Sequence, residues 1–168
     1  GIRHLRQAIG GLARRASWSD AADGAISLAG ALLHRGRARD AQTALDEAQG
    51  YAVRAGCDRL LIDIATLAGD AWVSLARLDE AERVLGAALA GAKAAGDCAQ
   101  STAASVSLAR CLFWRGHYAD AQTVLGALPD GVSATLGSRH SRLAARIAVG
   151  QADLRSAMST IADAKQRY

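Results

Sequence analysis

The sequence predicts an all-α fold, an α-solenoid of antiparallel helix pairs with three to four repeats. The segment RGRARDAQTAL, residues 35–45, returns as RGHYADAQTVL, residues 115–125, with seven of eleven positions identical. Between them, residues 75–85 read LARLDEAERVL and are in phase with both, so the period is 40 residues. The chain also has only 4% aromatic residues and one proline, which favours helix over sheet. Helical units that recur every 20–50 residues or so are typical of a solenoid.

The repeats divide the chain in a simple way. Residues 1–16 are expected to form a helix, the remnant of a preceding repeat, because Leu5, Ile9 and Leu12 share one face. The repeat domain is expected to cover residues 21–168, with units at about 21–57, 58–98, 99–129 and 138–168.

Each unit is expected to contain two helices. In the first unit, Ala25, Leu28, Ala29 and Leu32 follow the spacing of one helix face. Glycine adopts a left-handed backbone at low cost, so glycines are expected to end helices at Gly36, Gly56 and Gly96. Asp40 is expected to interact with the free N–H groups of the second helix. Small residues recur where the paired helices would cross, at Ala41, Ala81, Ala121 and Ala157.

The fourth unit departs from the pattern. Its copy of the repeated phrase is GQADLRSAMSTI, residues 150–161, which is offset by 36 residues from the third. The segment before it, residues 128–138, contains Pro129, Gly131 and Gly137 and is expected to be a loop. Ser138 is then expected to cap the next helix.

These residues resemble the tetratricopeptide (TPR) repeat family. The segments GHYADA, residues 116–121, and ARLDEA, residues 76–81, are similar to its inter-helix turn, and Leu85 and Leu125 to its later apolar site. The large-small or small-small pair of its first helix is matched by Leu108 with Ala109 and by Ala68 with Gly69. The resemblance covers about residues 21–166 and implies a right-handed α-solenoid whose first helices line a concave surface.

Two departures from the family refine the resemblance. The period is 40 residues here, against about 34 in the family. An Ala-Gly ending also replaces the usual proline after the second helix, at Ala55-Gly56 and Ala95-Gly96. In both respects the chain is similar to the longer TPR-like segments of large bacterial transcriptional regulators, namely LuxR-type activators of the maltose-regulon kind and enhancer-binding activators.

No motif for catalysis or cofactor binding occurs. The four histidines form no HExxH motif, and the three cysteines, Cys57, Cys98 and Cys111, form no CxxC pair. Phosphate-binding loops of the GxxxxGK[ST] type are also missing. We therefore expect no enzyme activity, no cofactor and no metal site.

A binding groove is expected on the first helices. Asp63 and Asp70 share a face of the second unit's first helix, and Arg139, Arg142 and Arg146 share a face in the fourth unit. The resemblance turns these faces inward, together with Arg110, Phe113 and Trp114 of the third unit. We expect an acidic middle and a basic C-terminal end that suits a carboxylate-rich peptide. In the alternative interpretation Phe113 or Trp114 is core, and the arginines are solvated or pair with neighbouring acidic residues.

We therefore expect a non-catalytic protein-protein interaction domain, with a scaffold or regulatory role in a bacterial cytoplasmic transcriptional or signalling regulator. Its partner would be a protein, a peptide or another domain of the same chain. Gly1 in place of Met suggests a segment of a longer protein or the remnant of a tag. No apolar stretch is long enough to cross a membrane. Small-molecule sensing, nucleic-acid binding and homodimer formation are the alternatives. Nucleic acid is the least expected ligand here, since 20 basic residues face 16 acidic ones.

Overall fold

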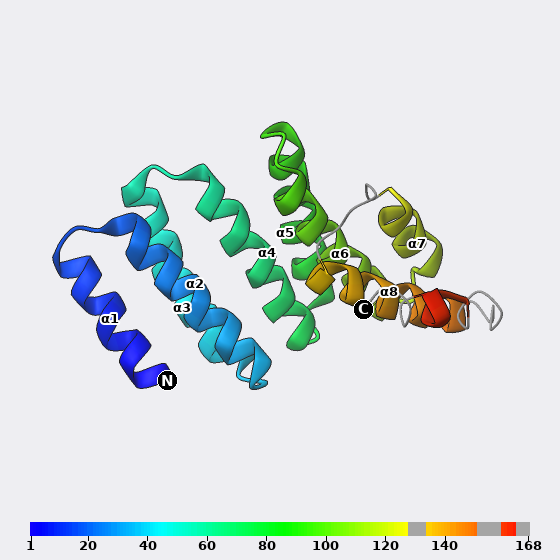
Figure 1. The fold of residues 1–168 in the computed structure, drawn as a ribbon, viewed down its shortest axis with the longest axis horizontal. Coiled ribbons are helices and arrows are strands. Elements are labelled where there is room, and N and C mark those ends of the chain that lie inside the picture. Colours follow the sequence, from blue (N-terminus) through cyan, green and yellow to red (C-terminus); the bar gives the residue numbers. More distant parts are fainter. Residues whose placement is uncertain (128–133, 151–158, 164–168) are drawn as a thin grey trace.

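The computed structural model describes residues 1–127, 134–150 and 159–163, with side chains in the middle range from Ser141 onward. Eight helices follow one another along the molecule (Figure 1): α1 (Ile2–Arg14), α2 (Trp18–His34), α3 (Ala38–Ala55), α4 (Asp58–Ser74), α5 (Leu78–Ala94), α6 (Cys98–Trp114), α7 (Tyr118–Gly126) and α8 (Ala134–Gly150). A further short helical stretch covers residues 159–163, and these described ranges contain no strand. The prediction of an all-α helical-repeat fold is confirmed.

Helices α2 to α7 begin every 20 residues, from residue 18 to residue 118. Two residues before each start, the backbone is left-handed, with φ between 57° and 80°, at Ala16, Gly36, Gly56, Ala76, Gly96 and Gly116. At the α2–α3 turn, the N–H of Arg37 donates to the carbonyl of Leu32, and that of Gly36 donates to Leu33. This hydrogen-bond pattern is a Schellman motif, which ends one helix and reverses the chain. The expected stops at Gly36, Gly56 and Gly96 are confirmed.

Three helix pairs and part of a fourth make up the solenoid. Each helix packs against the next in sequence, and α2 also packs on α4, α4 on α6, and α6 on α8. The even-numbered helices therefore form one continuous layer, as expected for the first helix of each unit. Helix α1 packs on α2 at the N-terminal end.

Two local expectations differ from the structure. Helix α8 begins at Ala134, so Ser138 lies inside the helix and does not cap it. A single helical glycine costs only about 1 kcal/mol, so Gly137 does not stop this helix.

Asp40 lies in the first turn of α3, but its carboxylate accepts from Arg37 Nε at 2.7 Å and makes no side-chain capping bond. Leu154 and Ala157 of the fourth unit lie outside the described residues.

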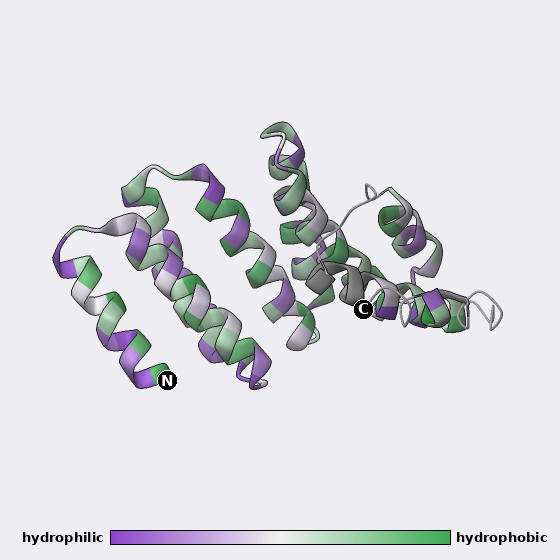
Figure 2. Ribbon diagram, viewed as in Figure 1, coloured by the Kyte–Doolittle hydropathy of each residue, from purple (hydrophilic) through white to green (hydrophobic). Residues whose placement is uncertain are grey.

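The core is built largely from alanine and leucine, and each helix carries both apolar and polar positions (Figure 2). Ala41, Ala81 and Ala121 are fully buried, as expected at helix crossings. At Gly69 of α4 a Cβ atom would lie 2.3 Å from Leu85 Cγ of α5, so only glycine allows this approach. None of the described helices combines the length and apolarity needed to span a bilayer.

Candidate ligand-binding groove

A groove of about 370 Å³ runs along the layer of even-numbered helices. All of the described residues that line it come from α2, α4, α6 or α8. The contributions are Gly30, Leu33 and His34 from α2, Leu67, Asp70 and Ser74 from α4, Val106, Ser107, Arg110, Phe113 and Trp114 from α6, and Arg142, Leu143 and Arg146 from α8. Six of the eight predicted site residues therefore line one groove: Asp70, Arg110, Phe113, Trp114, Arg142 and Arg146.

One row of the groove consists of equivalent positions in successive units. Gly30, Asp70, Arg110 and Arg146 are spaced 40, 40 and 36 residues apart, and all four line the groove. We call these four residues the groove row. Because the solenoid sets each unit beside the last, residues far apart in sequence become neighbours along this row.

The centre of the groove row contains an ion pair. Arg110 Nη2 donates to Asp70 Oδ1 at 2.7 Å, and the Asp70 side chain is only 13% exposed. The Arg110 guanidinium thus offsets the negative charge of Asp70, which the sequence analysis predicted for the middle of the groove. The Nε atom of Arg110 is buried and has no hydrogen-bond partner. Among the described lining residues, the charges at the centre are therefore paired, and two further arginines lie along the groove on α8.

Two aromatic side chains continue the groove beyond Arg110. Phe113 and Trp114 meet edge to face with ring centroids 5.4 Å apart. Phe113 is half-buried and packs against the apolar cluster of α6, α7 and α8, whereas 58% of Trp114 is exposed. Core packing therefore describes Phe113 but not Trp114.

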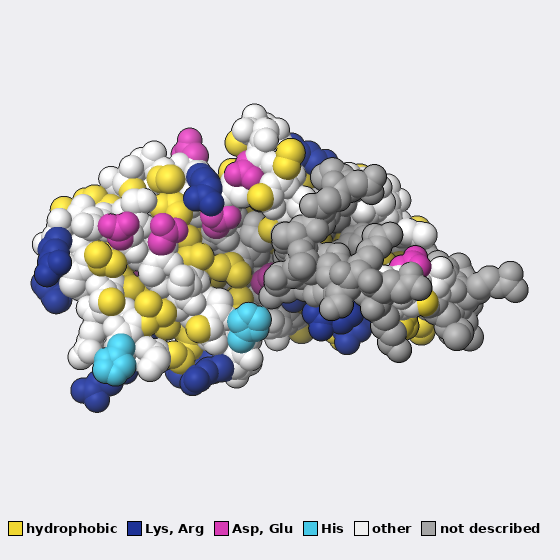
Figure 3. Space-filling model, in the orientation of Figure 1, with side chains coloured by type: hydrophobic (Ala, Val, Ile, Leu, Met, Phe, Trp, Pro, Cys, Tyr) yellow, Lys and Arg dark blue, Asp and Glu magenta, His cyan; other side chains and the backbone are white. Residues whose placement is uncertain are grey.

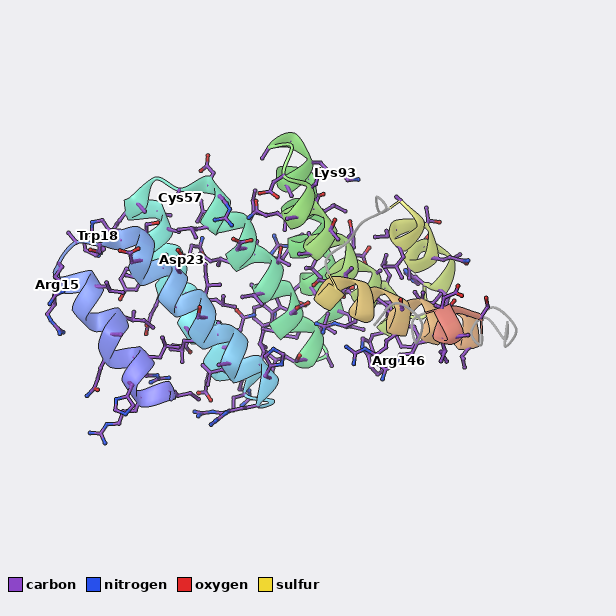
Figure 4. All side chains as sticks on the ribbon, viewed as in Figure 1. Arg15, Trp18, Asp23, Cys57, Lys93 and Arg146 are labelled. Carbon is purple, nitrogen blue, oxygen red and sulfur yellow. The ribbon has the colours of Figure 1, made fainter. Side chains whose placement is uncertain are left out.

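The C-terminal end of the groove is basic. Arg142 and Arg146 of α8 are both exposed. Figure 4 labels Arg146, whose side chain extends away from α8, and Figure 3 shows basic side chains gathered in this area. The side chain of Arg139, the third arginine of the predicted set, lies outside the described residues.

Asp63 has a different environment from the other predicted site residues. It does not line the groove, and its Oδ1 accepts from Gln100 Nε2 at 2.7 Å. The same Nε2 donates to the carbonyl of Arg59 at 2.8 Å, so Gln100 ties α6 to α4. The structure thus gives Asp63 a contact between units.

Helix α2 supplies three lining residues that the sequence analysis did not select: Gly30, Leu33 and His34. Leu67, Ser107 and Leu143 were also missed. The spacing held a usable signal for Gly30, which stands 40 residues before Asp70 and 80 before Arg110.

The described residues that line the groove include no cluster that could hold a metal ion. In the described part of the chain, no three His, Cys, Asp or Glu side chains come close enough to hold a metal ion. Cys111 is buried, and burial raises the pKa of its thiol above the ordinary value of 9.0. The arrangement can instead offer shape, one exposed indole and two exposed guanidinium groups to a ligand.

Comparisons with models of known families, with curated proteins and with solved structures gave no match to this chain.

Proposed function

We propose that this chain is a non-catalytic interaction domain that binds a segment of a partner protein, or of its own chain, in the groove. One observation carries the proposal: the whole groove is built from one helix of each successive unit. A ligand that lies along it contacts several units at once, which is how helical-repeat surfaces bind extended segments. The TPR-like spacing supports this assignment, and a bacterial transcriptional or signalling regulator is the kind of parent protein we propose.

The charge distribution favours an acidic segment. Arg142 and Arg146 offer planar, bidentate donors to carboxylates, and Trp114 adds an exposed apolar surface beside them. The Asp70–Arg110 pair leaves the centre of the groove close to neutral, so the attraction is concentrated on α8.

The test uses short random peptides displayed on phage and selected on the whole chain. Affinities of the selected peptides are then measured by fluorescence anisotropy for the wild type and for Arg142→Glu/Arg146→Glu. We expect the double variant to weaken binding roughly tenfold or more, because each substitution replaces a carboxylate partner with a like charge. Arg14→Glu/Arg15→Glu is the matched control, since it makes the same charge change at exposed positions near the end of α1. Equal losses in both variants, or none in either, would exclude the α8 end of the groove as a binding surface for an acidic segment.

A small-molecule effector is the second candidate function. The groove volume of about 370 Å³ lies within the range of about 300–1,000 Å³ typical of small-ligand sites. A thermal-shift screen separates the two functions, because a small ligand of the folded state raises the melting temperature without any peptide.

A further inference from the structure

The first position of the groove row has no side chain. Gly30 lies inside α2 and lines the groove, and a Cβ atom added there would meet no atom within 4 Å. The equivalent positions in the next units carry Asp70, Arg110 and Arg146. The N-terminal end of the row is therefore open where the other units present long or charged side chains.

Packing does not account for this glycine. At Gly69 of α4, by contrast, a side chain would collide with Leu85 of α5. Gly30 has free space instead, because a Cβ atom there would contact nothing within 4 Å, and its backbone is ordinary helix. A glycine within a helix is also less favourable than almost any other residue. The space over Gly30 is thus left open at some cost to the stability of α2.

About one helical turn from Gly30 on α2, the groove is lined by one apolar and one polar side chain, Leu33 and His34. Leu33 of α2 and Leu67 of α4 line the same groove and are both only half-buried. Contact with a further apolar group would remove more of their surface from water, which is favourable. The exposed arginines of α8 lie at the other end of the groove row, beyond the Asp70–Arg110 pair.

We propose that the opening over Gly30 is a subsite for a large apolar side chain of the bound segment. The ligand is then an extended peptide with a leucine-sized or aromatic residue at one end and carboxylates at the other. The inference rests on the proposed function and adds to it the chemical class of the ligand and the residue that determines it. Gly30 sets the apolar specificity by the absence of a side chain, and Arg142 and Arg146 set the acidic specificity.

The sequences of the phage-selected peptides test whether Gly30 sets the apolar specificity and the arginines of α8 set the acidic specificity. We expect peptides selected on the wild type to share one large apolar position and one acidic position at a fixed separation. Selection on Gly30→Gln is expected to lose the apolar position and keep the acidic one. Selection on Arg142→Glu/Arg146→Glu is expected to show the reverse.

Affinity measurements provide the quantitative test. Gly30→Gln places a side chain in the opening and is expected to weaken a selected peptide roughly 10- to 100-fold, as expected when a buried apolar side chain is displaced. Gly50→Gln is the matched control, because Gly50 is an exposed glycine of α3, outside the groove, with nothing within 4 Å of its Cβ position. The control is expected to keep its affinity within about twofold. Both variants should melt at or above the wild-type temperature, since glutamine is the better helix former, so loss of folding would be recognised.

Two failures are distinguishable. If selected peptides lose affinity with the α8 double variant but not with Gly30→Gln, the apolar subsite is wrong and the groove remains the binding surface. If neither Gly30→Gln nor the α8 double variant weakens any selected peptide, the proposed function is wrong as well.

Discussion

Six turns of the solenoid place one residue each in the left-handed region, and two of these residues are alanines. Ala16 and Ala76 have φ values of 57° and 59°, close to those of the glycines at the equivalent positions. An L-residue with a Cβ atom is strained in this conformation by about 1–2 kcal/mol. The strain is tolerated because the helices on both sides determine the turn.

Replacing Ala76 with glycine is expected to stabilise the chain by about 1 kcal/mol, because it removes this strain. Ala95→Gly provides the control. Ala95 is an exposed residue at the end of α5 whose backbone is right-handed, at φ −76° and ψ −10°. There the same substitution only adds flexibility to the unfolded chain, so it should destabilise by about 0.5–1 kcal/mol. Urea unfolding of both variants gives the signs, and the same sign in both would contradict the strain argument.

Gly69→Ala is expected to destabilise the chain by about 1–3 kcal/mol, because the new methyl group would overlap Leu85 and force α4 and α5 apart. Gly86→Ala changes the same atoms in α5, where nothing lies within 4 Å of the Cβ position. It should instead stabilise by about 0.5–1 kcal/mol. Thermal unfolding monitored by circular dichroism compares the two, and a stable Gly69→Ala variant would rule out the close approach.

At the scale of the helix, α6 connects the units, because it packs against both neighbours in sequence and against α4 and α8. Its Cys111 is completely buried, whereas Cys98 at its start is exposed. The Cys111 Sγ–H also donates to the carbonyl of Leu78 at 3.4 Å. One thiol of this helix is therefore accessible to solvent, and the other is shielded from it.

A thiol reagent is expected to modify Cys98 in the folded protein at once, and Cys111 only when α6 separates from α5. Burial raises the pKa of Cys111, so the folded state holds this proton more tightly than the unfolded chain does. The stability that this provides is complete below the ordinary thiol pKa of 9.0 and is lost as the pH rises above it. Unfolding experiments between neutral and alkaline pH should show that the free energy of unfolding falls more steeply for the wild type than for Cys111→Ala. Parallel curves would mean that the thiol ionises equally in both states.

The sequence was sufficient to predict the helix pairs and the face on which most of the candidate site residues lie. The 40-residue period and the helix-ending glycines at 36, 56 and 96 placed the units. The same period relates Asp70 to Arg110, but only the structure shows that the two residues lie in one row of a groove. The Asp63–Gln100 bond could not be predicted, because it joins residues 37 apart in a way that depends on how α4 and α6 pack. The start of α8 was missed because the glycines near it were assigned to a loop.

For the whole molecule, the apolar core is divided unevenly along the solenoid. A large cluster joins α1 to α4, and a second joins α6 to α8. Between them lies a small cluster of three buried residues, Ala81 and Leu85 of α5 and Cys111 of α6. The junction at α5 thus has the smallest cluster of the three, and stability in repeat proteins depends on such contacts between neighbours.

Leu85→Ala is expected to cost about 2–5 kcal/mol and to separate the unfolding of the two ends. Hydrogen exchange should then show α2 and α3 protected under conditions in which α6 and α7 exchange freely. Leu45→Ala is the matched control, since Leu45 is equally buried and belongs to the large cluster. It should destabilise α2 and α3 themselves. A single coincident transition for Leu85→Ala would show that the junction is not the weak point.

The turns recur at the same position in every unit, and this regular spacing affects how such a chain can be lengthened. Residues 58–97 begin and end at the same point of the repeat, so a tandem copy of that stretch would continue both helical layers without a break in geometry. Such a copy would place a second aspartate next to Asp70 and move the two ends of the binding surface one unit further apart. The span between the contacts a partner must make is therefore adjustable by duplication alone, while the chemistry at each end stays as it is.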